Sequence, residues 1–198
     1  MARSGPITTD TSTVPLGLAQ IRVGSSPGNI ASTEPVLSSS DSMGAMASTK
    51  FIGNTDWYKL ESGFPLGEDL SIVIREAAAL ECAFKQLTPY NMAIAYGIAA
   101  SGSGEYSEVH SGEVKLGGRC APEYVRMEAV YTYPRCTVTN HLYIIFPRAQ
   151  VVSSVEVDFQ AEEVANVPIT FESKNSSSDV TGGNAAWDNK PLGRFFWD

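Results

Sequence analysis

Few residues of this chain have the type and spacing that chemistry requires. His110 and His141 do not form the H-x-x-x-H or H-E-x-x-H spacing of a zinc site, and each is interpreted as a surface residue. Glu162 and Glu163 are adjacent on a connector, where neighbouring carboxylates are usually solvated. The glycines of the Gly/Ser-rich loops are not followed by the G-K-[ST] of a phosphate-binding loop. The sequence therefore predicts no catalytic residue, no metal ligand and no cofactor.

The cysteines and the charge exclude further classes of protein. The chain has three cysteines, Cys82, Cys120 and Cys136. Their number is odd and no two of them form a C-x-x-C pair, so neither a disulfide framework nor a zinc site is expected. The net charge is −8, and the 14 basic residues are scattered. A protein that grips phosphates needs grouped Lys and Arg, so specific nucleic-acid binding is not expected. No basic-then-apolar leader and no apolar run of membrane-spanning length are seen, which predicts a cytoplasmic protein at synthesis.

The elements that would position any site are mostly strands. Charged residues make up only 18% of the chain, and Gly, Ser and Thr are plentiful, which favours β structure with many turns. A polar arm is expected over residues 1–13, and a turn or short helical connector over 161–168. The strongest alternation of apolar and polar side chains runs through residues 149–159, in a strand that starts near Leu142. Further strands are predicted at 14–23, 51–60, 109–116, 124–133 and 167–172.

Residues 70–87 allow two interpretations. Leu70, Ile72, Ile74 and other apolar residues up to Phe84 share one parity, which is typical of a strand. The stretch REAAALECAFK, in contrast, consists of good helix formers. The β-branched start and the sustained alternation favour the strand.

A short helix follows this strand. Thr88 is expected to be its N-cap and Pro89 its first residue, because proline has no N–H to leave unsatisfied there. Gly97 is expected to end it.

Two irregular segments are predicted to contact other subunits. Residues 24–50 are rich in Ser, Gly and Pro, and a loop of this length is unusual inside a compact monomer, so contact with a partner is favoured over disorder. Residues 174–198 form a C-terminal extension that is polar until it ends in consecutive aromatics, for which docking on a neighbour is favoured over folding back. The expected interface residues are Ile30, Val36, Leu37, Met43, Met46, Trp187, Phe195, Phe196 and Trp197.

The order of these features resembles a known family. A strand through residues 57–63 and its return through 70–76 look like the central hairpin of bacteriophage tail tube proteins, the major tail proteins. The Phe-Lys-Gln-Leu-Thr-Pro-Tyr-Asn passage at residues 84–91, with its helix closed by Gly97, is similar to a passage of that family. The Pro-Arg-Ala break at residues 147–149 follows in the expected order, and then the strands at 155–159 and 167–172. The resemblance covers about residues 50–172.

This resemblance implies a fold and a set of partners. The fold would be mainly β: a single tail-tube domain over residues 1–198, a β-sandwich or barrel with one short flanking α-helix. Copies would form homohexameric rings whose inward hairpins join into a β-barrel, and the rings would stack helically into a tube that conducts DNA during viral genome ejection. Partners would be further copies, the tape measure protein and DNA in the lumen without specific binding, the tail terminator, baseplate or distal tail proteins, and a sheath if the tail is contractile. The protein would be a non-enzymatic late protein of the virion tail, assembled in the host cytoplasm.

The same resemblance suggests which residues line the lumen. An anionic lining would repel DNA phosphates and let the genome slide. The polar residues at alternate positions of the hairpin strands are expected to form this lining. The expected lumen residues are Ser71, Arg75, Glu81, Lys85, Arg126, Glu128, Thr132, Gln150, Ser154 and Glu156.

Three alternatives stay open on sequence grounds. The tube protein of a contractile injection or secretion system is expected to share this fold. A glycan-binding β-sandwich would expose aromatics in its loops, and Trp57, Trp187 and Trp197 are candidates for that role. An enzyme with an unrecognised site is the third.

Overall fold

The protein is one antiparallel sheet that bends around its own core. The computed structural model describes residues 17–62, 67–97, 114, 116, 123–133, 140–157, 159 and 164–198. The strands follow the order β1-β4-β5-β6-β3-β2, and β7 pairs with β5 off this path, so the sheet is not closed. The mainly-β prediction is confirmed. The strands are β1 (Gln20–Ser25), β2 (Met46–Ser62), β3 (Gly67–Phe84), β4 (Val125–Thr132), β5 (His141–Val151), β6 (Val167–Ser173) and β7 (Arg194–Trp197).

Six of the strands contribute to one apolar cluster, and β2 does so only through Met46 at its start. Ile21 of β1, Phe84 of β3, Met127 of β4, Phe146 of β5 and Phe171 of β6 are all at most 2% exposed and lie in it. Strands whose side chains share a core in this way cannot lie in a flat sheet, so the sheet curls around the cluster. The alternation that the sequence shows in β6 is confirmed, since Val167, Ile169 and Phe171 are buried and their neighbours are more exposed.

The residues after β3 form the predicted helix. Helix α2 (Pro89–Ala95) begins after Thr88, whose hydroxyl accepts a hydrogen bond from the Asn91 amide at 3.1 Å. Gly97, with a φ of +74°, follows the helix and takes the left-handed conformation that suits glycine. Asn91 is buried, and its side-chain amide donates to the Met43 and Gln86 carbonyls, both at 2.8 Å. This amide ties the helix to the segment before β2.

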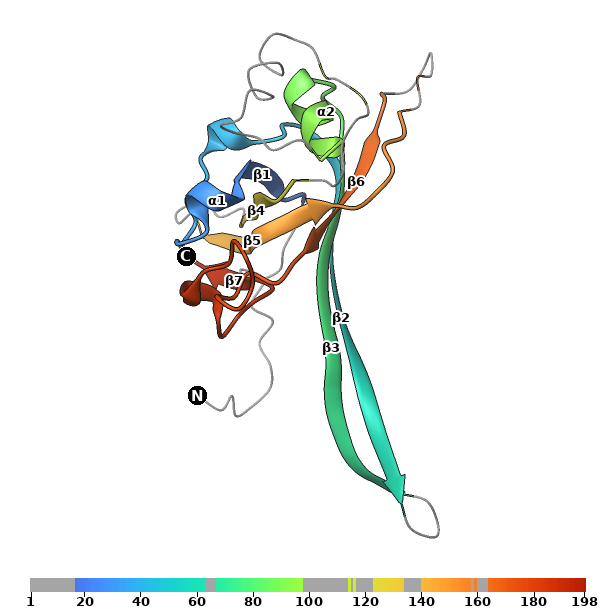
Figure 1. Ribbon diagram of the computed structural model, residues 1–198. Coiled ribbons are helices and arrows are strands. Elements are labelled where there is room, and N and C mark those ends of the chain that lie inside the picture. The colour runs from blue at the N-terminus through green and yellow to red at the C-terminus, as the bar shows by residue number, and fades with distance from the viewer. Residues whose placement is uncertain are drawn as a thin grey trace, which may run out of the picture.

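The dominant feature is the hairpin of β2 and β3, which projects well beyond the other strands (Figure 1). Residues 70–84 are strand, so the strand interpretation of this segment is confirmed. Pairing decides against the local helix propensity, because β3 bonds to β2 along its whole length and to β6 over Ala79–Phe84. Beyond Ala79, no third strand of the described chain pairs with the hairpin.

Several expected boundaries are wrong. The strand expected at 14–23 lies at β1, six residues further along at its start. The segment expected to be irregular, 24–50, contains the end of β1, helix α1 (Ser26–Asn29), a 3-10 turn (Ser39–Asp41) and the start of β2. The expected arm 1–13 and most of the strand expected at 109–116 lie outside the described residues, and Val114 and Leu116 are not in a strand.

The strongest alternation does not mark a strand along its whole length. β5 ends at Val151, and the residues after it leave the ladder. Val155 and Val157 still pack against the core cluster. Alternation therefore marks side chains that pack inward only as far as Val157, because Phe159 is 78% exposed. The Val152 amide still bonds to the Thr170 carbonyl of β6 at 3.0 Å, one residue past the end of β5. Of the expected connector at 161–168, residues 164–166 are irregular and β6 begins at 167.

Candidate assembly surface

The two faces of the hairpin are defined by its strand pairing. Directly paired residues of antiparallel strands point to the same face. Asp56 pairs with Arg75, but Trp57 pairs with Val73, so β3 carries one extra residue, Ile74, as a β-bulge. β2 has no insertion here and therefore sets the faces. We call the face that carries Leu80 the core-side face; its pairs are Phe51 with Leu80, Gly53 with Ala78, Thr55 with Glu76, Trp57 with Val73, and Lys59 with Ser71. The pairs of the opposite face are Lys50 with Glu81, Ile52 with Ala79, Asn54 with Ala77, Asp56 with Arg75, Tyr58 with Ile72, and Leu60 with Leu70.

The core-side face continues the hydrophobic core of the body. Leu80 is 2% exposed and belongs to the main cluster. The Phe51 ring lies 6.3 Å from that of Phe146 and 4.9 Å from that of Phe195, centroid to centroid. Trp197 stacks on Phe195 at 6.0 Å. The body of the protein therefore lies against this face at the base of the hairpin, and aromatic side chains of β7 complete the junction.

Large apolar side chains are exposed on both faces of the projecting part. Burial of each such side chain would contribute about 1.5–3 kcal/mol, so the side chains that another chain can reach favour contact with it. The exposed fractions lie between 38% and 67% for Trp57, Tyr58, Leu60, Leu70, Ile72, Val73 and Ile74.

Charges on the opposite face are balanced. Lys50 forms an exposed ion pair with Glu81, with 3.1 Å between Nζ and Oε2. Asp56 and Arg75 are cross-strand neighbours beside a polar hollow of about 220 Å³. An excess of acidic side chains, as expected for the lumen lining, is therefore absent from the described part of this face.

The structure separates the expected lumen residues. Arg75 and Glu81 lie on the opposite face, whereas Ser71 lies on the core-side face because the bulge at Ile74 reverses the parity of β3. The remaining expected residues with exposed or half-buried side chains are Lys85 after β3, Thr132 on β4, Gln150 on β5, and Ser154 and Glu156 after β5.

Arg126 and Glu128 are wrong as lumen residues. Both side chains are 0% exposed, and Arg126 Nε donates to Glu128 Oε1 at 2.7 Å. The remaining Arg126 donors bind the Asn29, Ser32 and Glu34 carbonyls at 2.7–2.8 Å. Burial lowers the pKa of Arg126, and the adjacent Glu128 carboxylate opposes this effect. The polar side chains Arg126 and Glu128 of β4 are buried because another segment of the chain, which includes Asn29, Ser32 and Glu34, covers them.

That covering segment is part of the region expected to contact another subunit. Glu128 accepts hydrogen bonds from the Val36 and Leu37 amides at 3.0 and 3.1 Å. Arg22 Nη1 donates to the Leu37 carbonyl at 2.8 Å. Side chains of the chain itself therefore hold residues 29–37. The expectation that another subunit holds this loop is wrong for the residues buried inside the chain, which are Ile30, Leu37, Met43 and Met46.

The C-terminal extension folds back. Trp187 is 0% exposed, and its indole N–H donates to the Ile30 carbonyl at 2.6 Å, so its assignment to the interface is wrong. β7 pairs with β5, and Gly193 (φ +121°) passes so close to the Ile145 carbonyl that a side chain would collide with it. Phe196 is half-buried against Tyr143. Val36, Phe195 and Trp197 are 43–63% exposed, which leaves them available for a partner.

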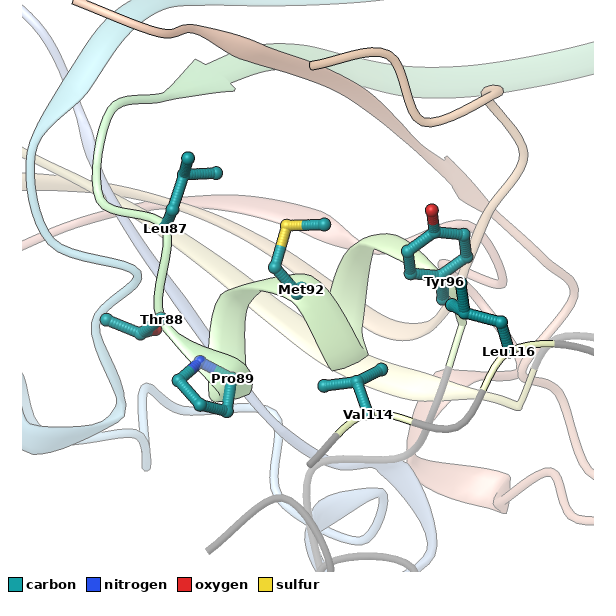
Figure 2. A pocket seen from close by; sticks show the side chains of 7 residues that line it. All are labelled: Leu87, Thr88, Pro89, Met92, Tyr96, Val114 and Leu116. Carbon is teal, nitrogen blue, oxygen red and sulfur yellow. The ribbon is translucent and has the colours of Figure 1, made fainter. Parts of the chain in front are cut away.

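An apolar groove lies along α2, at the end of the molecule away from the hairpin tip (Figure 1). Its volume is about 360 Å³. Met92 projects from the helix and Tyr96 from the position directly after it, and Val114 and Leu116 lie across from them (Figure 2). Leu87 and Tyr96 are 40% and 39% exposed. Thr88 and Pro89 complete the lining.

The described residues contain one sequence pattern of catalytic type that the histidines and carboxylates did not suggest. Gly24–Gly28 reads Gly-Ser-Ser-Pro-Gly, the spacing of a nucleophile elbow, and it joins a strand to a helical turn. Ser26 is 3% exposed, however, and its hydroxyl donates to the Pro147 carbonyl at 2.8 Å. The side chain is therefore a buried structural link and is not presented to a substrate.

Other groups with potential chemistry are also accounted for. Cys82 is buried, and burial raises the pKa of its thiol to about 12. His141 Nδ1 lies 3.0 Å from the Thr132 hydroxyl at the end of β4. Among the described residues, no three His, Cys, Asp or Glu side chains are grouped to hold a metal ion, and no helix is long and apolar enough to span a membrane. His110, Glu162 and Glu163 lie outside the described residues.

Comparison with known proteins gives structural likeness at low identity. No protein-family model and no curated protein match the chain. Among similar solved structures is the sheath–tube complex of the extracellular contractile injection system PVC in the extended state, with a TM-score of 0.46, 10% identity, and 98% of this chain and 99% of the other covered. Another is the tube terminating cap of the anti-feeding prophage, with a TM-score of 0.41, 13% identity, and coverage of 88% and 91%. Both TM-scores are below 0.5, so neither structure defines the function of this chain.

Proposed function

We propose that this chain is a non-enzymatic structural subunit that forms rings with copies of itself, and that the rings stack into the tube of a phage tail or of a related injection particle. The observation that carries the proposal is the projecting hairpin. β2 is the last strand of the sheet, and β3 has no second partner beyond Ala79 in the described chain. A long strand with free amides and carbonyls and exposed apolar side chains pairs readily with other chains.

Closure between copies satisfies both edges. In a ring, the free edge of β3 in one copy meets the free edge of β2 in the next, and this pairing is antiparallel because all copies point the same way. Such a contact uses two different surfaces, so it produces a closed ring wherever the rotation between copies closes. A barrel of hairpins then has no open edge left. The homohexameric ring belongs to this proposal through the family resemblance.

The position of the body decides which face lines the channel. The body packs on the core-side face through Leu80 and Phe51, so in a closed barrel the bodies lie outside. The opposite face then surrounds the channel with Lys50, Asp56, Arg75 and Glu81 among its side chains. This lining has no stripe of Lys and Arg, so it does not hold phosphates, which suits the passage of DNA without specific binding during genome ejection.

The partners follow from the same proposal. A ring stack needs an initiating complex at the baseplate or distal tail, a terminator at the other end and a tape measure protein inside, and a contractile particle adds a sheath. The assembled protein then belongs to the tail of the particle and is built in the host cytoplasm. A glycan-binding role has less support, because Trp187 is buried and Trp57 lies within a strand.

A truncated hairpin tests this proposal. Residues 54–77 are replaced by Asn-Gly, which joins the paired residues Gly53 and Ala78 by a two-residue turn. Because the main apolar cluster excludes the removed residues, the variant is expected to keep the thermal unfolding transition of the body and to remain monomeric in sedimentation velocity. The full chain, with a tail-initiating complex, is expected to form rings and tubes in electron micrographs. Rings or tubes of the truncated variant would contradict the proposal.

A substitution outside the hairpin is the control. Ala31 is exposed, lies outside the hairpin and is not among the expected interface residues. Ala31→Glu is expected to leave ring formation unchanged.

A further inference from the structure

We propose that successive rings are joined head to tail, by the core-side face of the projecting hairpin of one copy docking on the α2 groove of a copy in the next ring. This inference rests on the proposed ring assembly and names the contact that converts rings into a tube. Its two surfaces lie at opposite ends of one chain (Figure 1).

The length of the hairpin leaves room for a second copy beside its projecting part. The 17 residues of β2 span about 56 Å at about 3.3 Å per residue. Only the base is flanked, since β6 pairs with β3 no further than Ala79. The body lies beside the base of the hairpin, and α2 lies at the end of the body away from the tip (Figure 1). A copy shifted along the hairpin axis therefore brings its α2 end beside the projecting part.

Ring closure leaves apolar groups uncovered on this part of the hairpin. Closure pairs the strand edges, and the opposite face borders the channel. Trp57 and Val73 share the core-side face and are 55% and 38% exposed. They lie outside the barrel and beyond the body of their own copy. The α2 groove is lined mainly by apolar side chains, and its volume of about 360 Å³ is enough for large side chains.

The size of the contact explains why it would join rings and not single chains. Trp57 at 55% exposure offers roughly 130 Å², given that a buried aromatic side chain covers 150–250 Å². A stable pair of proteins buries about 800 Å² on each partner. One such contact is therefore too small to hold two monomers, but a ring presents all of its copies to the next ring at once. Because the two surfaces differ and lie at opposite ends, the stack stays open and can grow.

Two surface substitutions test this contact from its two sides. Trp57→Glu changes the hairpin, and Leu87→Glu changes the groove, where the side chain is 40% exposed. Each variant is mixed with a tail-initiating complex and imaged by electron microscopy. Both are expected to form rings that do not stack into tubes. Combining W57E with L87K is expected to restore stacking, because the opposite charges then meet across the ring boundary.

The matched control is Tyr58→Glu, a neighbouring aromatic that is 53% exposed on the opposite face. It is expected to keep tubes of wild-type length. Wild-type-length tubes from W57E or from L87E would overturn the inference, and so would loss of the rings themselves, which would place the residue in lateral closure. Failure of the unmodified chain to form rings would instead overturn the proposed function.

Discussion

At the residue scale, the pair of Arg126 and Glu128 dominates the interior. Removing two charges from water is costly, and attraction between them offsets that cost only when the remaining donors and acceptors are also satisfied. Here three carbonyls accept from Arg126 and two amides donate to Glu128. The pair therefore fixes the path of residues 29–37 over β4.

Breaking this pair is expected to be strongly destabilising. Glu128→Gln leaves Arg126 as an uncompensated buried charge, for which about 3–5 kcal/mol of unfolding free energy is expected to be lost. Lys50→Gln is the matched change in an ion pair whose side chains are 67% and 46% exposed, and it is expected to cost at most about 1 kcal/mol. Urea unfolding of both variants measures the difference, and equal costs would contradict the role of the buried pair.

The two C-terminal tryptophans are expected to behave differently. Trp187→Ala removes a side chain that is 0% exposed and leaves the Ile30 carbonyl without its donor, so a loss of about 3–5 kcal/mol is expected. Trp197→Ala removes a side chain that is 63% exposed and is expected to change stability by about 0.5 kcal/mol. Guanidinium unfolding curves of the two variants measure their unfolding free energies. A larger loss of unfolding free energy for Trp197→Ala than for Trp187→Ala would contradict the folded-back terminus.

The Cys82 thiol is expected to be unreactive in the folded protein. Burial raises its pKa from 9.0 to about 12, so the thiolate is scarce below that pH. Because the folded form holds this proton more tightly, the contribution of Cys82 to stability is present below pH 9 and is lost as the pH rises toward 12. Peptide mapping after iodoacetamide treatment at pH 8 is expected to show alkylated Cys82 only in denaturant. Rapid native alkylation would contradict its burial.

At the element scale, local signals were sufficient for helix α2 and for β6. Thr88, Pro89 and Gly97 carry the start and end of the helix in their own chemistry, and the alternation of β6 is uninterrupted. The strand character of β3 was also predictable, although its propensity is helical. The face on which each β3 side chain lies was not predictable. It depends on the bulge at Ile74, and that bulge is set by the register between β3 and β2, about which the sequence pattern of β3 alone carries no information.

The expected interface failed for the same physical reason. The Ser/Gly/Pro-rich sequence of residues 24–50 shows no periodicity, yet side chains from β4 and from the C-terminal segment hold part of it. A sequence pattern reports local preference, whereas these bonds join residues about 90 to 157 positions apart. The polar residues at alternate positions of β4 predict a surface strand, whereas Glu128 in fact binds backbone amides about 90 positions away and is buried.

The N-cap of α2 provides a prediction at this scale. Thr88→Ala removes the acceptor of the Asn91 amide, and a loss of about 0.5–2 kcal/mol is expected. Thr88→Ser keeps a hydroxyl at the cap and is expected to retain most of the stability. Thermal unfolding of the pair measures this, and equal stability of both variants with the unmodified chain would show that the cap contributes nothing.

At the scale of the whole molecule, the chain combines a self-sufficient body with an incomplete hairpin. The buried parts of residues 24–50 and of the C-terminal extension are held by the body itself, although the sequence predicts a partner for them. The projecting part of the hairpin has exposed apolar groups on both faces and no third strand within the described chain. Assembly is therefore expected to leave the conformation of the body almost unchanged and to use the hairpin together with the α2 groove as contact surfaces.

A cryo-electron microscopy map of the assembly formed by the purified chain on a tail-initiating complex tests this account most directly. The account predicts rings in which the free edge of β3, residues 67–78, bonds to β2 of the neighbouring copy, with the face that carries Lys50 and Arg75 toward the channel. An assembly whose hairpins do not touch one another, or a chain that stays monomeric with its hairpin folded onto its own body, would contradict it.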